Sequence, residues 1–323
     1  MKKFLFLILS LFPLVPLKAQ EKTIRLKGSP IVRLFVNYHA GLASANRHSG
    51  FELDRSYLGY AFRVNEKLSG QLIFDVGPTH AKEAELERVA YVKNAFLSWK
   101  PGNFTLNFGL VKTDQFSVQE SFWGYRYILK SFNDEYKFGP SADMGIILGY
   151  RFTDWLNADL SVTNGEGYKK INQDNNYRYG LGFTLRPAKS LILRAYYDLY
   201  NSDETGSDNQ TSLALFAGYT HTAFSIGIEY NKLWNTDFQP GHDQYGCSCY
   251  ASVDIFPRFT LFSRYDYLTS NRKWKGENNG QRLLTGVQYS PLTYLRIAPN
   301  FTSWNPSSGK IQPYLYLNLE FKL

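Results

Sequence analysis

Residues 313–323 read PYLYLNLEFKL, and apolar and polar side chains alternate through the whole stretch. Leu315, Leu317, Leu319 and Phe321 fall on one face of an extended chain, and the residues between them fall on the other. Because successive side chains of a β-strand point to opposite faces, this period of two predicts a strand between an apolar and a polar medium. The same alternation recurs along the chain, which favours a barrel with a wet interior.

The first residues have the composition of an export signal. Lys2 and Lys3 precede a mainly apolar run over residues 4–17, and a region suited to cleavage follows. We therefore expect residues 1–19 to be a cleaved signal peptide and residues 20–323 to form one barrel domain. After the signal, no apolar run approaches the ~20 residues that a membrane-spanning helix needs. An exported chain of alternating strands is typical of the bacterial outer membrane.

Sixteen alternating segments can be counted along the chain. They cover residues 30–38, 51–64, 69–77, 90–100, 103–112, 141–152, 155–164, 177–187, 190–200, 210–220, 223–234, 243–256, 258–269, 281–290, 292–303 and 311–323. Every second connection is short, such as Pro101-Gly102 and Ser290-Pro291, and the others are longer and polar, such as residues 201–210. Short turns at one rim and long loops at the other are characteristic of outer-membrane barrels. The predicted fold is therefore an all-β, antiparallel transmembrane barrel of sixteen strands, wide enough to hold an aqueous lumen.

Composition supports a membrane barrel and argues against nucleic-acid binding. Aromatic residues make up 17% of the chain, and Tyr and Trp suit the interfaces between lipid and water. The net charge is +8, but Lys and Arg are spread at strand spacing instead of gathering on one surface. We therefore expect no nucleic-acid partner. The expected surroundings are outer-membrane lipid and lipopolysaccharide.

The longest connection, residues 113–140, is the third long loop. It contains eight aromatic residues, among them Phe122, Trp123 and Tyr125. A loop of this length and composition packs against something. We predict that it folds into the barrel and narrows the lumen. A loop that caps the mouth or lies in a subunit interface is the alternative.

The parity of each strand predicts which charges face the lumen. Tyr179, Leu181 and Phe183 point to lipid, so Arg178 points inward. A misplaced Arg or Lys at mid-bilayer would cost roughly 2–4 kcal/mol. The predicted pore residues are Lys112, Arg126 and Lys130 near the constriction and Arg55, Arg151, Arg178, Arg194 and Arg264 on the wall. Such charges can set ion selectivity; alternatively, most pair with inward acids such as Asp159 and hold the wall together.

No arrangement for catalysis or metal binding is evident in the sequence. The five histidines (His39, His48, His80, His221 and His242) do not pair recognisably with a nucleophile and an orienting carboxylate. Cys247 and Cys249 have no cluster of further ligands around them. We therefore expect no enzyme activity, no cofactor and no metal site. A surface hydrolase is the least favoured alternative.

Four segments resemble the phosphate-selective porin O and P family. They are FELDRSYLGY at 51–60, GLVKTDQFS at 109–117, DMGIILGY at 143–150 and SVTNGEG at 161–167. Their order and spacing are similar to those of the family. The resemblance implies a sixteen-stranded homotrimeric porin whose third loop folds inward and which passes anions.

The sequence thus predicts an outer-membrane porin. We expect a passive diffusion channel for small hydrophilic solutes or ions, with a weak preference for anions. The alternative is a non-conducting barrel that serves as a scaffold or assembly partner of a surface complex. An occluding third loop would produce that second outcome.

Overall fold

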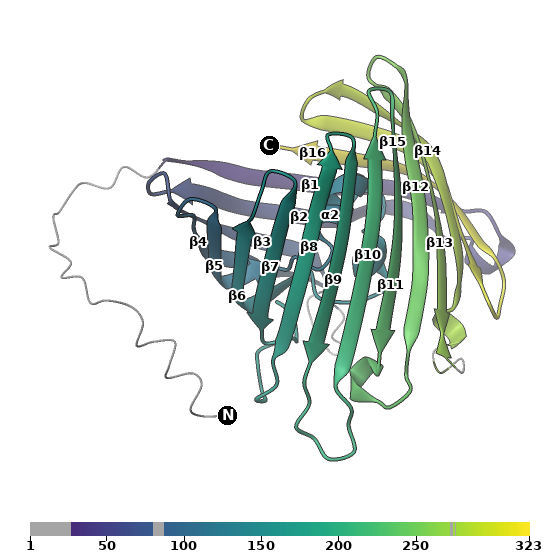
Figure 1. Ribbon diagram of the computed structural model, residues 1–323. Helices are drawn as coiled ribbons and strands as arrows, with labels where there is room; N and C mark the ends of the chain where they lie inside the picture. The colour runs from purple at the N-terminus through teal and green to yellow at the C-terminus, as the bar shows by residue number, and fades with distance from the viewer. Residues whose placement is uncertain (1–26, 80–86, 272–273, 275) are drawn as a thin grey trace, which may run out of the picture.

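Sixteen antiparallel strands close into one barrel (Figure 1), as the sequence predicted. The computed structural model describes residues 27–79, 87–271, 274 and 276–323, so the expected signal peptide and His80 lie outside the described residues. The strands are β1 (Lys27–Gly41), β2 (Ser49–Arg63), β3 (Leu68–Pro78), β4 (Arg88–Trp99), β5 (Phe104–Lys112), β6 (Ala142–Arg151), β7 (Leu156–Thr163), β8 (Arg178–Ala188), β9 (Leu191–Tyr200), β10 (Gln210–Thr220), β11 (Phe224–Trp234), β12 (Gln244–Phe256), β13 (Phe259–Ser270), β14 (Gly280–Leu292), β15 (Leu295–Pro306) and β16 (Gln312–Lys322). Each strand pairs with its neighbours in sequence, and β1 pairs with β16 to close the barrel. Among the described residues, no helix is long and apolar enough to cross a membrane.

The connections alternate between short turns and long loops. Turns of two to four residues follow the even-numbered strands, and β1 begins and β16 ends at the same rim. This rim is the periplasmic one in an outer-membrane barrel. The predicted position of one turn was wrong: the turn between β14 and β15 lies at residues 293–294, and Pro291 belongs to β14. The pairing of β14 with β15 is irregular between Tyr289 and Leu292. This irregularity lets Pro291, which has no backbone N–H, stay in the strand.

Strand β8 shows how alternation positions side chains on the two faces. Tyr179, Leu181 and Phe183 point outward and are 40–42% exposed, whereas the inward Arg178 and Thr184 are 5–6% exposed. Apolar side chains on the outside suit hydrocarbon, and polar ones inside stay near water or near each other. The same division holds around the barrel, where the exposed large side chains are mainly apolar.

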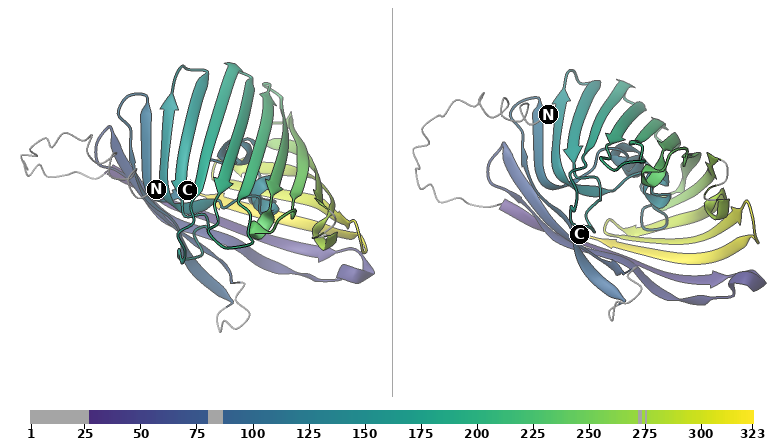
Figure 2. Two further views of the ribbon diagram at one scale, coloured as in Figure 1. Left: turned by 60° about the horizontal axis from the view of Figure 1, so that its bottom comes forward. Right: turned by 90° about the horizontal axis from the view of Figure 1, so that it is seen from below.

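Part of the chain lies inside the ring of strands (Figure 2), and the packed core forms where this part meets the wall. The connection between β5 and β6, residues 113–141, enters the ring of strands and carries two short helices, α2 (Ser117–Trp123) and α3 (Phe132–Glu135). The remaining helices of the described residues are single 3-10 turns in other long loops: η1 (Ser44–Asn46), η2 (Thr236–Phe238) and η4 (Gly276–Asn278). The prediction that the third long loop folds inward is therefore confirmed. We call residues 113–141 the inner loop.

Candidate constriction and its charges

The aromatic residues of the inner loop pack against one sector of the barrel wall. The rings of Trp123 and Tyr250 in β12 are 5.2 Å apart, and those of Tyr125 and Phe262 in β13 are 4.7 Å apart. All four side chains are at least 91% buried. Burial of each large ring is worth several kcal/mol in principle. The aromatic content of the loop is therefore accounted for by contact with the wall.

Two wall glycines make room for this contact. A Cβ atom on Gly218 of β10 would lie 2.5 Å from the ring of Phe122, and one on Gly246 of β12 would lie 2.7 Å from the ring of Phe132. Real side chains do not approach so closely, so a larger residue would push the loop off the wall. These positions allow the loop to lie flat against β10 and β12.

Hydrogen bonds attach the inner loop to the same sector. The donors and acceptors are Gln115 to Ser212 (2.9 Å), Asn133 to Asn231 (2.8 Å), Tyr136 to Asp266 (3.0 Å) and Tyr127 to Gln288 (2.9 Å). They reach β10, β11, β13 and β14 in turn. Asn318 of β16 also donates to the carbonyl of Tyr127 at 3.2 Å. The loop is thus fixed along β10–β16.

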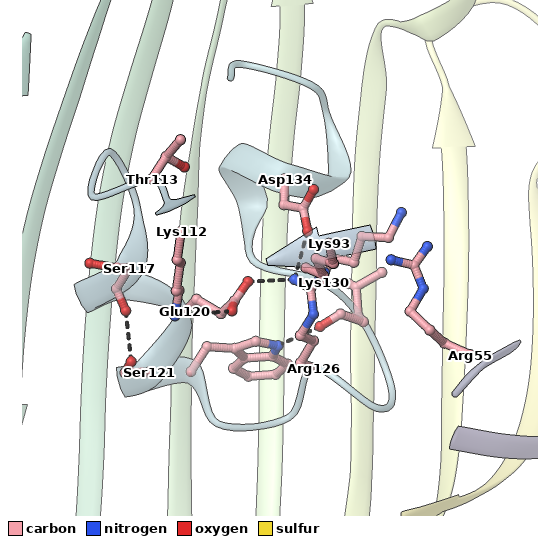
Figure 3. A network of polar contacts seen from close by, with 12 residues as sticks. Arg55, Lys93, Lys112, Thr113, Ser117, Glu120, Ser121, Arg126, Lys130 and Asp134 are labelled. Carbon is pink, nitrogen blue, oxygen red and sulfur yellow. Dashed lines mark hydrogen bonds and ion pairs between the residues drawn. The ribbon is translucent and has the colours of Figure 1, made fainter. Parts of the chain in front are cut away.

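Arg126 ties the inner loop together. Its Nη1 atom donates to the carboxylate of Glu120 and, at 2.6 Å, to Oδ2 of Asp134 (Figure 3). Its Nε atom lies 3.4 Å from the Tyr57 hydroxyl of β2. Burial alone would raise the pKa of Asp134, but the charges of Arg126, Lys130 and Lys93 outweigh it and lower the pKa below its ordinary value. Asp134 is therefore ionised at neutral pH.

Three more cations gather beside Arg126, as Figure 3 shows: Arg55, Lys93 and Lys130. Arg55 lies 3.2 Å from Asp75 of β3, and the ammonium of Lys93 is 4.0 Å from the same carboxylate. Lys93 also donates to the Tyr57 hydroxyl at 3.1 Å. The ammonium of Lys130 has no ion-pair partner within 4.0 Å among the described residues. One carboxylate is therefore shared by two cations here.

Two further lysines lie at the edges of this group. Lys112, which ends β5, has its ammonium 3.8 Å from Glu120. Lys169, in the loop after β7, lies over the ring of Tyr91 at 4.6 Å. The same loop sends the hydroxyl of Tyr168 to Asp75, at 2.6 Å. The loop after β7 thus joins the inner loop in lining the narrow part of the barrel.

The constriction cluster, as we call these charged side chains, carries more positive than negative groups. Its cations are Arg55, Lys93, Lys112, Arg126, Lys130 and Lys169, and its carboxylates are Asp54, Asp75, Glu120 and Asp134. Six cations meet four carboxylates, which leaves a modest positive excess. Charges in a confined, partly desolvated lumen act more strongly than the same charges on a surface.

Three of the other predicted arginines lie in closed pairs on the wall. Arg178 pairs with Asp198 at 2.7 Å, and both are buried. Arg194 holds Asp159 through two hydrogen bonds of 2.8 and 2.9 Å. Arg264 holds its partner Asp266 at 2.7 and 2.9 Å. These bidentate contacts fix side chains in place.

Two of these arginines also hold the inner loop. Arg194 donates to the carbonyl of Asp114 at 2.5 Å, and Arg264 donates to that of Lys130 at 2.7 Å. Arg151 is apart from all of them, exposed at the short-turn rim, where it donates to Asn103 at 3.0 Å. The structure therefore brings together Arg55, Lys112, Arg126 and Lys130, and it places the other four predicted residues elsewhere on the wall.

Sequence reasoning missed Lys93 and Lys169. The pairing of β3 and β4 shifts between Ile73 and Phe74, so a bulge shifts the parity of β4 beside Lys93. If the alternation of residues 94–99 continued without this bulge, Lys93 would lie on the lipid face. Lys169 lies in a loop, where no alternation applies. The available signal was weak: a lysine in the middle of a strand that is otherwise apolar on its outer face.

A second basic region lies at the short-turn rim. Lys27, Arg63 and Lys100 line a cavity of about 600 Å³ on the inner side of β1–β5. Its other described lining residues are neutral, among them Ser98 and Asn107, and none is acidic. Solutes that leave or approach the barrel at this rim meet positive charge.

Comparisons with known proteins agree with this geometry. The profile of the family BBP2, beta-barrel porin-2, OmpL-like, matches residues 135–304, just over half of the chain. No curated protein matches the sequence. Similar solved structures include Salmonella typhi OmpF in complex with daunomycin, at 12% identity over 92% of this chain and 98% of that one, with a TM-score of 0.70.

Two other solved structures are similar over comparable lengths. An anion-selective porin from Comamonas acidovorans is 10% identical over 93% of this chain and 100% of that one, with a TM-score of 0.68. The trimer form of in-vitro folded OmpT, an outer membrane protein of Vibrio cholerae, is 12% identical over 92% and 99%, with a TM-score of 0.60. These identities establish the fold alone, and they do not single out the phosphate-selective family that the motifs resemble. By the family match, the chain belongs to the BBP2 family: it is a porin-like barrel of the bacterial outer membrane and not an enzyme.

Proposed function

We propose that this barrel is a passive diffusion channel for small hydrophilic solutes and ions, with a modest preference for anions. The observation that carries the proposal is the positive excess of the constriction cluster, at the level where the inner loop narrows the barrel. Charged rings at a constriction set the sign of ion selectivity. The basic cavity at the short-turn rim adds to the same preference.

The preference is modest because most of the charge is paired. Arg126 faces two carboxylates, and Arg55 and Lys93 share Asp75. The field that remains comes chiefly from Lys130 and from the lysines at the edges of the cluster. We assign Arg55, Lys112, Arg126 and Lys130 to the constriction, as well as Lys93 and Lys169. In this proposal Arg178, Arg194 and Arg264 brace the wall, and Arg151 contributes at the rim. A solved anion-selective porin has the same fold.

The test is single-channel recording of refolded protein in a planar bilayer under a KCl gradient. We expect an open current whose reversal potential favours chloride. A reversal potential that favours potassium would refute the anion preference. Absence of current from protein shown to be folded would instead support the non-conducting scaffold. Block of the current by added phosphate would point to the phosphate-specific channel that the sequence motifs resemble.

Lys130→Glu provides the sharpest variant. It reverses one unpaired charge, and the Lys130 carbonyl that receives Arg264 is untouched. We expect the reversal potential to move toward the potassium limit. Lys310→Glu makes the same change of charge in an exposed part of the loop between β15 and β16, away from the constriction, and should leave the reversal potential nearly unchanged. Equal shifts in the two variants would remove Lys130 from the selectivity determinants.

We further propose that three copies assemble, as in the trimer form of OmpT. The wall at β5–β7 is short, with only eight residues in β7, and it presents Phe108, Met144 and Leu160 outward at 48–60% exposure. Native mass measurement in mild detergent should give a trimer that Leu160→Asn weakens. Leu261→Asn, on the lipid face of β13, is the matched control. A monomeric wild type would refute the assembly. N-terminal sequencing of the mature protein would test cleavage after residue 19.

A further inference from the structure

A cavity on the long-loop side of the constriction has an aromatic lining unlike that of the rim cavity. It measures about 400 Å³ and lies between the inner loop and β12–β16. Four rings line it: Tyr136 from the inner loop, Trp304 from β15, and Tyr314 and Tyr316 from β16. Its volume is within the ~300–1,000 Å³ of small-molecule sites. The cavity opens on the side from which external solutes arrive.

The rings form two adjoining surfaces. The centroids of Tyr136 and Trp304 are 6.0 Å apart with planes at 34°, and those of Tyr314 and Tyr316 are 5.8 Å apart with planes at 43°. Neither pair leaves room for a ligand between its own rings. Thr302 pairs with Tyr314 across the two strands, so Trp304 lies diagonally next to Tyr314. The lining therefore offers an aromatic platform made of these two pairs.

Polar groups of both kinds surround this platform. Gln312, Asn278 and Thr302 supply donors and acceptors, and Gln244 donates to the Tyr136 carbonyl at 2.8 Å. Leu268 is the single aliphatic side chain among the lining residues that the structure describes. An apolar ligand would leave these polar groups unpaired, which is costly. The site therefore suits a ligand with many hydroxyl groups.

The described lining of the cavity carries little net charge, with two cations and one carboxylate. Arg282 pairs with Glu135 at 3.2 Å, and its guanidinium lies 5.5 Å from the ring of Trp304 and 5.8 Å from that of Tyr136. That guanidinium thus lies beside two rings, and Glu135 neutralises its charge. Lys137 is the one remaining cation of the described lining. The cavity is close to neutral, in contrast with the constriction cluster.

We propose that this cavity binds neutral saccharides. A pyranose ring has apolar C–H faces, which stack on aromatic rings, and hydroxyl groups at its edge, which need donors and acceptors. The cavity supplies both, in the arrangement that such a ring requires. The inference rests on the proposed function in one respect only: external solutes reach the cavity through the mouth of the proposed channel. The channel would then collect sugars at its outer vestibule before they reach the charged constriction.

The test is equilibrium binding of maltohexaose and xylohexaose to detergent-solubilised protein by isothermal titration calorimetry. We expect at least one hexasaccharide to bind and Trp304→Ala to weaken it about three- to tenfold, since one aromatic contact is worth about 0.5–1.5 kcal/mol. Trp304→Phe should restore most of the affinity. Trp155→Ala, at an exposed tryptophan of the short-turn rim, is the control and should bind like the wild type.

Several results would overturn the proposal. The first is that neither hexasaccharide binds. The second is that Trp304→Ala and Trp155→Ala bind the sugars equally well, and the third is that benzoate binds through Trp304 while the sugars do not. Circular dichroism and the electrophoretic mobility of the folded barrel show whether Trp304→Ala has folded; Gln312→Leu, which removes only a polar edge group, is the second variant and should also weaken binding. Binding does not require current. Current without sugar binding refutes this inference alone, and sugar binding without current refutes the channel alone.

Discussion

Replacing Arg126 with Gln should loosen the inner loop without unfolding the barrel. Arg126, Glu120 and Asp134 have side chains only 11%, 15% and 16% exposed. Removing one partner of a buried ion pair costs about 3–5 kcal/mol, because the charge left behind has no compensation. Since these side chains keep some contact with lumen water, we expect the lower end, about 3 kcal/mol. That corresponds to about a 100-fold change in the equilibrium between the attached and detached loop.

Hydrogen exchange measured by mass spectrometry follows this equilibrium directly. The amides of Gly124 and Tyr136 donate within the loop to the carbonyls of Glu120 and Phe132, at 3.1 Å each. Peptides that cover residues 117–136 should lose about 100-fold of their protection in Arg126→Gln, and peptides from β9–β11 should be unchanged. Local opening of this kind does not require global unfolding. The experiment is independent of whether the channel conducts.

Two further variants separate charge from geometry. Arg126→Lys keeps one positive charge but loses the planar guanidinium, whose Nη1 atom donates to both carboxylates while its Nε atom reaches Tyr57, so we expect an intermediate loss of about tenfold. The triple variant Glu120→Gln, Arg126→Gln, Asp134→Asn removes all three charges and should regain most of the protection, because no charge remains unpaired. Unchanged protection in Arg126→Gln, or a triple variant as loose as the single one, would refute the reasoning.

Three other predictions concern pH and the wall. Protection of the inner loop should hold at neutral pH and fall only as the pH drops through the pKa of Asp134, which is lowered below its ordinary value of 3.8. The reason is that a carboxyl with a depressed pKa stabilises the folded form above that pKa. Loss of protection already near pH 6 would contradict this prediction. Arg194→Met should lower the free energy of unfolding in urea by about 3 kcal/mol, and the addition of Asp159→Leu should recover most of it. Gly109→Ala should lower the free energy of unfolding by about 1–3 kcal/mol, since φ at Gly109 is +124° and a Cβ there would lie 2.4 Å from a backbone carbonyl oxygen of β4. Gly77→Ala, where a Cβ would have no neighbour closer than 3.9 Å, should leave the free energy of unfolding nearly unchanged.

The strands could be predicted because lipid on one side and water on the other impose a period of two on every one of them. A shift of one residue in the register of a strand would send each inward charge to the lipid face. The alternation therefore predicts both that a strand is present and which of its side chains face the lumen. Boundaries carry less information. Pro291 was interpreted as a turn residue, yet the local irregularity near Tyr289 accommodates it in β14.

The pairing of the wall charges could not be predicted from alternation. Arg194 in β9 reaches Asp159 in β7 across β8, and this path is open only because Gly182 lies between them. A Cβ there would be 2.5 Å from Asp159 and 2.7 Å from Arg194. Parity correctly predicts that both charges face inward, but the partner depends on register over three strands and on the absence of one side chain. The position of Lys93 beside a bulge escaped prediction for a related reason, because the register there is not uniform.

The two kinds of cation in this barrel have different physical roles. Arg178, Arg194 and Arg264 are buried in bidentate or stacked pairs, so their replacement affects stability and leaves little net field to lose. Lys130 has no ion-pair partner among the described residues, and Arg264 of the wall contacts only its backbone carbonyl, so a change of its side chain leaves that attachment in place. Selectivity can therefore change through lysines at the constriction while the arginine pairs keep the inner loop in place. We expect Lys130 variants to shift the reversal potential with little change in stability, and variants of Arg178, Arg194 and Arg264 to lower stability at nearly constant reversal potential.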